Sequence, residues 1–476
     1  MPVFHTDIVE TNTSTPSALQ RLHDALTKLW SQREALEDFE GFEREVHGLF
    51  VEAEREVLAE GLERLDVDLP QVVIEGQVHH RVLRSPETYT TAVGLVTVTR
   101  TLYRTDKDAQ AVVPLELRAG IVAGHWTALA ARQATFLVAH LTPQETENVL
   151  RELGNMTPSK SGLDRLPKRL SERGGVKREG FEAALRAPIA RVPSEALTLA
   201  VSLDGVMVPM KDGQRDEKRA QGRREGKKTR GPAGYQEVGC ATLSFYDAQG
   251  ERLETVRLAR MPEPKKATLK SMLSAEVEAV LRQRPELQVV KLADGAEDNW
   301  RYFSTALPGG VELVDFFHAA EHLQAAFATA YGENSSSTQA QSAKYRHLLL
   351  EETDGVETVI RALRYLRDKH PRRTRIGQVL GYFRRHRHRM RYAEARAQNL
   401  PVGSGVVEAA CKTLATQRMK RSGMRWRHDG GQAILTFRAL VQSERFKQAW
   451  PLLSSTYRTE VSAPENVVAF PRRRLH

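Results

Sequence analysis

Cysteine is scarce in this chain of 476 residues, and long apolar runs are missing. The two cysteines, Cys240 and Cys411, are too few and too far apart in the sequence for a disulfide scaffold or a cysteine-rich zinc module, so we expect a reducing, cytoplasmic setting. No stretch of about 18 uninterrupted apolar residues occurs, and residues 1–14 have neither a basic head nor an apolar run. We therefore expect neither secretion nor membrane insertion.

Acidic residues are outnumbered, and the chain carries a formal net charge of +10 at pH 7. The excess is local: residues 361–450 contain 22 Lys and Arg against 5 Asp and Glu, whereas residues 34–68 form an acidic amphipathic stretch. Net charge alone fits either nucleic acid or an anionic membrane surface. Its concentration toward the C-terminus favours a phosphate-rich partner such as nucleic acid.

Within the first 125 residues, the pattern of apolar residues changes once, from helical spacing to a composition that favours strands. Apolar residues at helical spacing among alternating charges predict long helices within residues 17–65. Residues 72–104 are rich in β-branched and aromatic residues, which favour strands. We therefore expect a helical region at residues 1–70, a candidate for oligomerisation, followed by a small β-rich element at residues 71–125.

Helices are expected to resume near Trp126, in a region of residues 126–193. Residues 142–153 and 157–166 each begin with capping residues, and Gly154-Asn155 lies between them, which is the outline of a helix-turn-helix. Pro167 is expected to end the second helix. DNA reading and plain packing are equally good interpretations, because any two short helices on such a turn look alike.

From residue 194 the pattern alternates between strands and helices, which is typical of an α/β domain. The expected order is three strands, a helix, a strand, a helix and a strand, at residues 197–204, 236–246, 252–259, 267–284, 288–294, 298–307 and 311–315. This is the order of the ribonuclease-H fold. We expect that α/β fold at residues 194–331 and 401–450, with an all-α insertion at 332–400, a mobile basic loop at 211–234, a helix at 406–421 and a C-terminal tail at 451–476.

Three carboxylates lie where that fold would bring them together. Asp204 is expected at the end of the first strand, Asp294 at the end of the fourth, and Glu408 on the helix after the insertion. Such a cluster suits two divalent cations that assist phosphodiester transfer. Taken singly, each residue also fits an ordinary role: Asp-Gly is a common turn pair, and Glu408 suits a helix N-terminus or an ion pair with Lys412.

The blocks around these carboxylates add a more specific signal. Residues 197–450 resemble the Kra-type insertion-sequence transposases, which are related to Mutator-type elements. The matching blocks are Val201-Ser-Leu-Asp-Gly-Val206, Leu292-Ala-Asp-Gly-Ala296, Asp315-Phe-Phe-His-Ala-Ala-Glu-His-Leu323 and Gly403-Ser-Gly-Val-Val-Glu-Ala-Ala-Cys-Lys-Thr413 with Arg418-Met-Lys-Arg-Ser-Gly-Met-Arg-Trp426. The resemblance implies that Asp204, Asp294 and Glu408 bind two Mg²⁺, with Mn²⁺ as a substitute. Asp315 and His318 match the Asp-x-x-His element that accompanies this triad.

The resemblance also implies an activity and partners. The enzyme would cleave double-stranded DNA at element ends to free 3′-hydroxyls, then join them to target DNA, as a homodimer or larger assembly associated with the nucleoid. A Gly-x-x-x-x-Gly-Lys-Ser/Thr loop is absent from the sequence, so no nucleotide cofactor is expected. The N-terminal likeness is looser, because Thr105-Asp-Lys-Asp108 stands where relatives often carry Cys-x-x-Cys.

Three other functions stay open from the sequence. A ribonuclease-H-like nuclease or resolvase would use the same metal ions, and a DNA-binding descendant of a transposase would use none. His318-Ala-Ala-Glu-His322 also fits the inverted motif of zinc peptidases, with both histidines on one helical face. In the transposase interpretation His318 would contact phosphate or orient the metal site, and His322 would pack or cap.

Two basic segments are the candidate DNA contacts. Residues 382–392 place aromatic side chains among dense cations, which suits phosphate contacts with base stacking, although a solvated helix face has the same composition. The cations near Glu408 are the stronger candidates, because they share its helix and loop. Trp426 fits either stacking on DNA or packing. The expected DNA-binding residues are Arg384, Arg385, Arg387, Arg389, Lys412, Arg418, Lys420, Arg421, Arg425 and Trp426, with Arg427 beside them.

Overall fold

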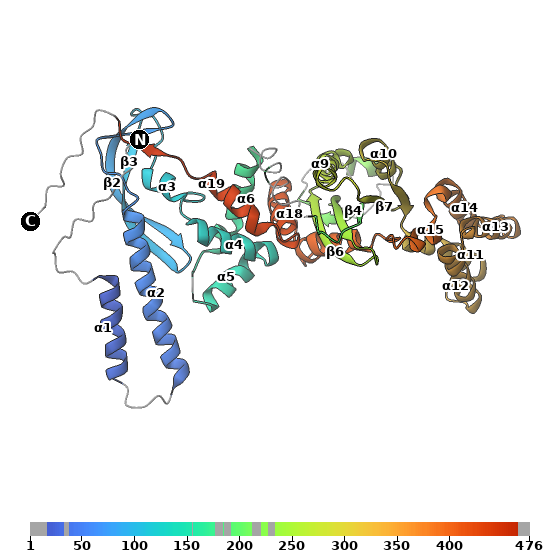
Figure 1. Cartoon of the computed structure of the whole chain (residues 1–476), viewed down its shortest axis with the longest axis horizontal. Coiled ribbons are helices and arrows are strands. Elements are labelled where there is room, and N and C mark those ends of the chain that lie inside the picture. The colour runs from blue at the N-terminus through green and yellow to red at the C-terminus, as the bar shows by residue number, and fades with distance from the viewer. Residues whose placement is uncertain are drawn as a thin grey trace, which may run out of the picture. The chain divides into compact units, whose positions relative to one another are not determined.

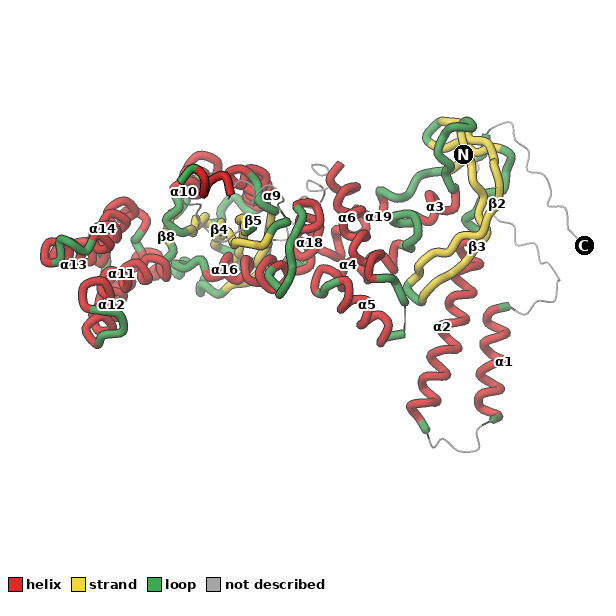
Figure 2. Tube along the Cα trace, turned by 180° about the vertical axis from the view of Figure 1, so that it is seen from behind, coloured by secondary structure: helices red, strands yellow, loops and turns green. Residues whose placement is uncertain are grey.

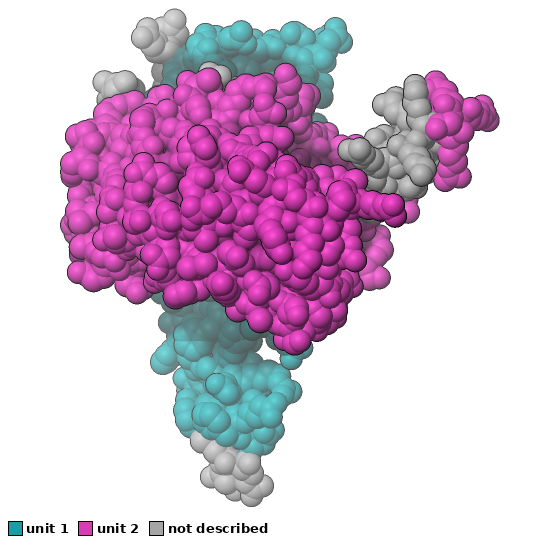
Figure 3. All heavy atoms as spheres, turned by 90° about the vertical axis from the view of Figure 1, so that its right-hand side faces the viewer, with its two compact units in different colours: residues 1–134, 143–166, 454–476 teal, residues 135–142, 167–453 magenta. Residues whose placement is uncertain are grey.

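The computed structural model describes residues 17–32, 38–154, 156–176, 184, 192–211, 220–226 and 234–464. The chain divides into two compact units, shown in separate colours in Figure 3. Unit 1 contains residues 1–134, 143–166 and 454–476, and unit 2 contains residues 135–142 and 167–453. Within the described ranges, no helix is both long enough and apolar enough to cross a membrane.

Unit 1 begins with two helices, α1 (Ala18–Ser31) and α2 (Phe39–Glu63), that lie side by side (Figure 2). Each starts at a side chain that accepts a backbone N–H: Ser17 caps α1 and Asp38 caps α2. Arg21 of α1 forms an ion pair with Glu56 of α2 at 2.5 Å. The prediction of long helices between residues 17 and 65 is therefore confirmed.

A four-stranded antiparallel sheet follows, in the order β3-β2-β1-β9. Its strands are β1 (Gln71–Ile74), β2 (Gln77–Thr91), β3 (Gly94–Arg104) and β9 (Val461–Ser462). Glu75 and Gly76 both have positive φ, which matches the right-handed strand twist in a two-residue hairpin turn. The strands predicted for residues 72–104 are confirmed, and the segment expected as a C-terminal tail contributes β9.

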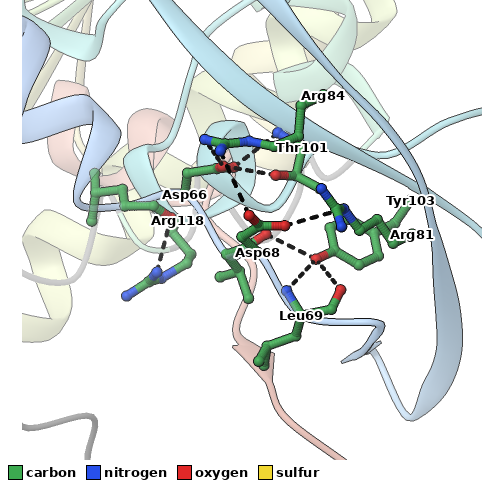
Figure 4. Close-up of polar contacts among 10 residues, drawn as sticks. Asp66, Asp68, Leu69, Arg81, Arg84, Thr101, Tyr103 and Arg118 are labelled. Atoms are coloured by element: carbon green, nitrogen blue, oxygen red, sulfur yellow. Dashed lines mark hydrogen bonds and ion pairs between the residues drawn. The ribbon is translucent and has the colours of Figure 1, made fainter. Parts of the chain in front are cut away.

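Two carboxylates connect the end of α2 to this sheet (Figure 4). Asp66 accepts hydrogen bonds from the backbone N–H and the hydroxyl of Thr101, at 3.0 and 2.8 Å. Asp68 forms an ion pair with Arg81 at 3.1 Å, and Arg84 lies within 3.5 Å of both carboxylates. The acidic segment therefore has a structural role in unit 1.

Four helices follow the sheet: α3 (Pro114–Ala119), α4 (Ala128–His140), α5 (Pro143–Glu152) and α6 (Lys160–Val176). The two helices of the predicted helix-turn-helix, α5 and α6, are present, although Asn155 of its turn lies outside the described residues. The prediction that Pro167 ends the second helix is wrong, because α6 continues to Val176. Leu163, Leu166 and Leu170 are buried at helical spacing, so packing holds the helix across the proline.

Unit 2 is built on a five-stranded mixed sheet in the order β6-β5-β4-β7-β8. Its strands and the two helices between them are β4 (Thr198–Pro209), β5 (Tyr235–Tyr246), β6 (Arg252–Arg260), α9 (Ala267–Gln283), β7 (Gln288–Ala293), α10 (Glu297–Ala306) and β8 (Val311–Val314), with η1 (Pro264–Lys266) before α9. β5 pairs antiparallel with β4 and β6, whereas β7 pairs parallel with β4 and β8. The predicted order of strands and helices is confirmed, and the chain is a mixed α/β protein (Figure 1).

Helices cover both faces of the five-stranded sheet. Gly239 of β5 faces α9, where a Cβ atom would lie 2.8 Å from Leu269, and the neighbouring Cys240 faces a second layer that contains Val407 and Leu435. That second layer consists of α16 (Gly405–Ala410), the π-helix η3 (Cys411–Thr416), α17 (Gln417–Met419) and α18 (His428–Gln442). α19 (Phe446–Ser455) is the last helix in the described part of the chain. The helix predicted for residues 406–421 is thus present as three consecutive segments.

The all-helical segment runs from residue 316 to 397, so it begins before residue 332, where the insertion was expected to start, and we call residues 316–397 the helical insertion. Its elements are α11 (Phe316–Tyr331), α12 (Ser336–Glu351), α13 (Gly355–Lys369), α14 (Thr374–His386), η2 (Arg387–Arg389) and α15 (Tyr392–Ala397). Its apolar side chains belong to the same core as those of β4, β7 and β8. Tyr392 is fully buried and donates a hydrogen bond to the carbonyl of Val314, so the insertion is packed directly on the sheet. Of the predicted basic loop at 211–234, residues 212–219 and 227–233 lie outside the described residues.

Candidate functional site

Asp204 lies on β4, and Asp294 directly follows the last residue of β7, the strand beside it. The last parallel pair of these strands is Ser202 with Leu292, and each aspartate follows its paired residue by two positions on the same face. The expectation that Asp204 ends its strand is wrong, because β4 continues to Pro209. The reason is that β5 continues to pair with β4 as far as Pro209 and Tyr235, beyond the point where β7 has ended.

The surroundings of Asp204 favour its neutral form. Burial raises the pKa of its carboxyl, a 2.7 Å hydrogen bond from the backbone N–H of Gly205 lowers it, and the nearby charge of Asp294 raises it again. The Cys411 thiol lies 3.7 Å from the same carboxylate. Asp204 is therefore held by the strand and by η3, next to a second negative charge.

Asp294 is held by the turn that it begins. Its Oδ1 accepts hydrogen bonds from the backbone N–H of Ala296 at 3.1 Å and from the Asn299 side chain at 3.3 Å. Its backbone carbonyl accepts a hydrogen bond from the Trp300 indole at 2.7 Å. All three donors lie in the first turns of α10 or just before them. This helix therefore holds both the carboxylate and the backbone of Asp294 in place.

Glu408 reaches the same region from α16. The helix begins at Gly405 and lies on β4 and β5, which places Glu408 in its first turn. Burial raises the pKa of Glu408, and the charges of Asp315 and Asp204 raise it further, whereas His318 lowers it. In the part of the chain that the structure describes, Glu408 forms no ion pair with Lys412. The interpretation of Glu408 as the partner of Lys412 therefore does not apply.

Asp315 connects the two segments on either side of the helical insertion. Its fully buried carboxylate caps α11 by accepting the backbone N–H of His318 at 2.7 Å, and it also accepts the backbone N–H of Ser404 before α16. Burial alone would raise the pKa of Asp315, but the hydrogen bonds from His318 and Ser404 lower it to about 2. The insertion therefore begins and ends at one buried charge.

A metal-ligand geometry is present beside Glu408. Among the described residues, one group of three His, Cys, Asp or Glu side chains has ligand atoms that all lie within 4.8 Å of one another, and it consists of Asp315, His318 and Glu408. His318 Nδ1 lies 3.4 Å from Asp315 and 3.9 Å from Glu408, and hydrogen bonding to Asp315 raises the pKa of His318 to about 9. The predicted set of Asp204, Asp294 and Glu408 does not have this spacing, although Asp294 raises the pKa of Asp204 and Asp204 raises the pKa of Glu408.

His322 does not join that group. Its ring lies against the Tyr382 ring, with 4.2 Å between centroids, and burial lowers the pKa of its imidazole. Packing, one of the two roles expected for His322, is what the structure shows. The two histidines of the peptidase-like motif therefore have different surroundings, and the ligand geometry pairs His318 with Asp315, the cap of its own helix, and with Glu408 of α16.

The predicted DNA-binding cations fall into two groups. Six are exposed: Arg384, Arg385, Arg387, Lys412, Lys420 and Arg425. Arg421 is half-buried, and Arg389 is engaged within the fold, where it pairs with Glu312 at 2.8 Å and lies 4.2 Å from the Trp300 ring centroid. These contacts give Arg389 a role within the fold, and its contact with DNA stays a prediction.

Arg418 and Trp426 also belong to the interior. Arg418 is 2% exposed and lies 5.2 Å from the Trp426 ring centroid. The Trp426 indole donates to the carbonyl of Met419 at 2.9 Å, and its ring packs on the layer that covers β4 and β5. Arg418 is therefore a buried residue of the fold, and its contact with DNA stays a prediction, whereas Trp426 is partly buried and packs, one of the two roles expected for it.

Sequence reasoning missed the role of two residues, Tyr382 and His386. Both are on α14, and a Cβ atom built on Gly295 would lie 2.5 Å from the Tyr382 ring and 3.4 Å from His386 Nε2. The sequence places them in a basic run, which suggests contact with DNA. Their spacing of four residues indicates a shared helix face that differs from the face of the exposed arginines, and this signal was available.

No protein-family model matches the sequence, and no curated protein matches it either. The function of the chain is therefore argued from its own residues and their geometry.

Proposed function

We propose that this chain is a DNA transposase whose unit 2 is a ribonuclease-H-like catalytic domain. The observation that carries the proposal is the convergence of Asp204, Asp294 and Glu408 from a strand, a turn and a helix that are distant in sequence. The proximity of Asp294 raises the pKa of Asp204, and that of Asp204 raises the pKa of Glu408, which supports a shared site. Such a cluster of hard oxygen ligands suits Mg²⁺ or Mn²⁺.

The topology supports the proposal independently. Three antiparallel strands followed by two parallel ones, with helices on both faces, is the arrangement expected of a ribonuclease-H-like domain. The carboxylate blocks also resemble those of the Kra-type insertion-sequence transposases. The helical insertion separates the strands from the helix that carries Glu408, as the sequence blocks require.

The electrostatics of the site fit a divalent cation. Asp204 and Glu408 both have raised pKa values, in part because other carboxylates are near, so a cation between them would relieve the repulsion. When bound, two Mg²⁺ ions supply activation of the attacking oxygen and stabilisation of the leaving oxygen. β4 and α16 hold the carboxylates rigidly, and Asp315 fixes the segment that leads into α16.

The proposal also requires DNA binding and assembly into oligomers, which we assign to exposed cations and to exposed apolar residues. The exposed Arg384, Arg385 and Arg387 would bind phosphates of double-stranded DNA. Two element ends must be paired, so we propose a homodimer or larger assembly. The helical hairpin of unit 1 has the apolar surface for it, because Trp30 and Phe39 are 57% and 63% exposed.

The test is a reconstituted reaction. The DNA that flanks the gene is searched for inverted repeats, and the purified full chain is incubated with those ends, target DNA and Mg²⁺. Cleavage that frees 3′-hydroxyls, followed by joined products, supports transposition, and Glu408→Gln serves as the inactive control. Cleavage without joining indicates a nuclease or resolvase, and binding without cleavage in either Mg²⁺ or Mn²⁺ indicates a DNA-binding protein.

A further inference from the structure

The helical insertion lies directly against the turn that carries Asp294. Gly295 follows Asp294, and a Cβ atom at this position would lie 2.5 Å from the Tyr382 ring and 3.4 Å from His386 Nε2. No real Cβ atom tolerates the first of these distances, so glycine is required by the close approach of α14. The position of the Asp294 turn therefore depends on two side chains from a different part of the unit.

These two side chains are buried and polar, and their polar atoms are unpaired. His386 is 3% exposed, and neither of its ring nitrogens has a hydrogen-bond partner among the described residues. The Tyr382 hydroxyl is also buried without a partner there. A buried polar atom left unpaired costs about 1–3 kcal/mol, so such atoms call for an explanation.

Their charge state fits a role beside carboxylates. Burial lowers the pKa of His386 to about 4, so the imidazole is neutral near pH 7 and offers one donor and one acceptor. Burial also raises the pKa of Tyr382, and the charges of Asp294 and Asp315 raise it further, so the hydroxyl keeps its proton. Both residues can thus donate a hydrogen bond toward the acidic site without adding charge to it.

Tyr382 also contacts the other side of the site. Its ring packs on His322 of α11, with 4.2 Å between ring centroids, and the first turn of α11 carries His318 and its cap Asp315. On Asp294, the hydrogen bonds within the described chain all go to Oδ1, from Ala296 and Asn299. The second oxygen of this carboxylate therefore remains available to a further donor.

We propose that Tyr382 and His386 are positioning residues of the metal site, whose hydroxyl and imidazole hold the Asp294 carboxylate in its ion-binding orientation through buried water. This inference rests on the proposed function, because it assumes that Asp294 binds a divalent cation. Partners behind a metal ligand commonly contribute 10–100-fold to metal affinity, because they fix the ligand's orientation. The helical insertion would then complete the metal site as well as bind DNA.

The experiment is a Mn²⁺ titration of the full-length protein without DNA, followed by the electron paramagnetic resonance signal of free Mn²⁺. The variants are Tyr382→Phe, which keeps the ring, and His386→Gln, which keeps a donor and an acceptor in a different geometry. Matched controls are Tyr365→Phe and His388→Gln, because both residues are exposed on the same insertion. We expect about 10-fold weaker Mn²⁺ binding in the two variants and wild-type binding in the controls.

A third variant tests the contact without removing either polar group. Gly295→Ala pushes on the Tyr382 ring, so it should weaken Mn²⁺ binding in the same way, and thermal unfolding by circular dichroism shows whether each variant is folded. If Asp294→Asn weakens binding while Tyr382→Phe and His386→Gln equal their controls, the positioning role is overturned and the metal site stands. If Asp294→Asn leaves Mn²⁺ binding unchanged, the metal site fails and this inference fails with it.

Discussion

Asp204 and Asp294 each lie two residues beyond Ser202 and Leu292, the last pair that joins the parallel strands β4 and β7. Their supports differ. Asp204 lies within β4, which stays paired with β5 on its other side, whereas Asp294 lies on a turn held by α10 and α14. The site therefore combines one carboxylate fixed by a strand with one whose position depends on side-chain packing.

Replacing any of the three carboxylates by its amide should abolish cleavage. Asp204→Asn, Asp294→Asn and Glu408→Gln each remove one negative charge from the proposed metal site without changing side-chain size. We expect at least about a 100-fold loss of DNA cleavage in Mg²⁺, because even partners behind a metal ligand contribute up to that amount. The measurement is the rate of end cleavage on a gel.

Folding and DNA binding should survive these changes. Asp204 and Glu408 both have raised pKa values in the folded protein, so neutralising either removes repulsion, and we expect equal or higher melting temperatures. Glu352→Gln, on the surface of the same unit, is the matched control. Near-normal cleavage in any one amide variant would remove that residue from the site.

Much of unit 2 could be predicted because its strands are locally distinct. β5 is buried over most of its length, and its run of apolar and small residues bounded by turns carries that information. The extension of β4 beyond Asp204 could not be predicted, because only its pairing with β5 sustains it. The expectation that Pro167 ends its helix was also wrong, because buried leucines on both sides of the proline keep the helix intact.

The carboxylates of the candidate site could be proposed from the sequence, but the side chains that contact and orient the site residues could not. Asp204, Asp294 and Glu408 stand out because each lies in a distinctive block. Arg389 and Arg418 read as surface cations, since a sequence does not reveal that Glu312 or Trp426 will lie beside them. Arg389 and Glu312 are 77 residues apart, so the local sequence does not show that this contact will occupy the charge of Arg389.

The exposed arginines of α14 and η2 should control the salt dependence of DNA binding. Replacing Arg384, Arg385 and Arg387 together by Ala should reduce the slope of log affinity against log salt by up to about 2.7, or about 0.9 for each lost phosphate contact. Arg389→Ala is the control, because its guanidinium is bound to Glu312 and its loss should alter stability instead. An unchanged slope in the triple variant would assign these residues to a solvated face.

One buried ion pair should contribute strongly to the free energy of unfolding of unit 2. Arg445 and Glu276 are each 6% exposed, and Arg445 Nη1 lies 2.9 Å from Glu276 Oε1. Arg445→Ala leaves the carboxylate buried and unpaired, so we expect a loss of about 3–5 kcal/mol in the free energy of unfolding. The double variant Arg445→Met with Glu276→Leu should recover most of it in urea titrations. A single variant as stable as wild type would show that solvent reaches the carboxylate.

Metal content distinguishes carboxylate chemistry from a zinc peptidase. We expect the purified protein to hold little metal, to remain folded in EDTA and to regain cleavage when Mg²⁺ is added, because carboxylates bind that ion weakly and reversibly. Elemental analysis alongside cleavage assays in EDTA, Mg²⁺ and Zn²⁺ tests this. Stoichiometric zinc that is lost on replacing His318 and His322, together with no Mg²⁺-dependent cutting, would exclude the proposed function.

Acid should destabilise the protein through His386. Its pKa is lowered from 6.5 to about 4 by burial first, then by Arg389, Arg385 and His388, while Asp294 opposes them. Between these two values the unfolded chain binds a proton that the folded protein does not, so stability falls as pH drops from about 6.5 to about 4 and then levels off.

His386→Gln removes this titration, so the variant should lose less stability than wild type between pH 7 and pH 5. The difference should be on the order of 1 kcal/mol, since one unit of pKa corresponds to about 1.4 kcal/mol and partial solvation reduces the effect. Urea unfolding of both proteins at pH 7, 6 and 5 measures it, with His388→Gln as the exposed control. Parallel losses in all three proteins would mean that His386 is hydrated in the folded state, since only a desolvated imidazole resists protonation at pH 5.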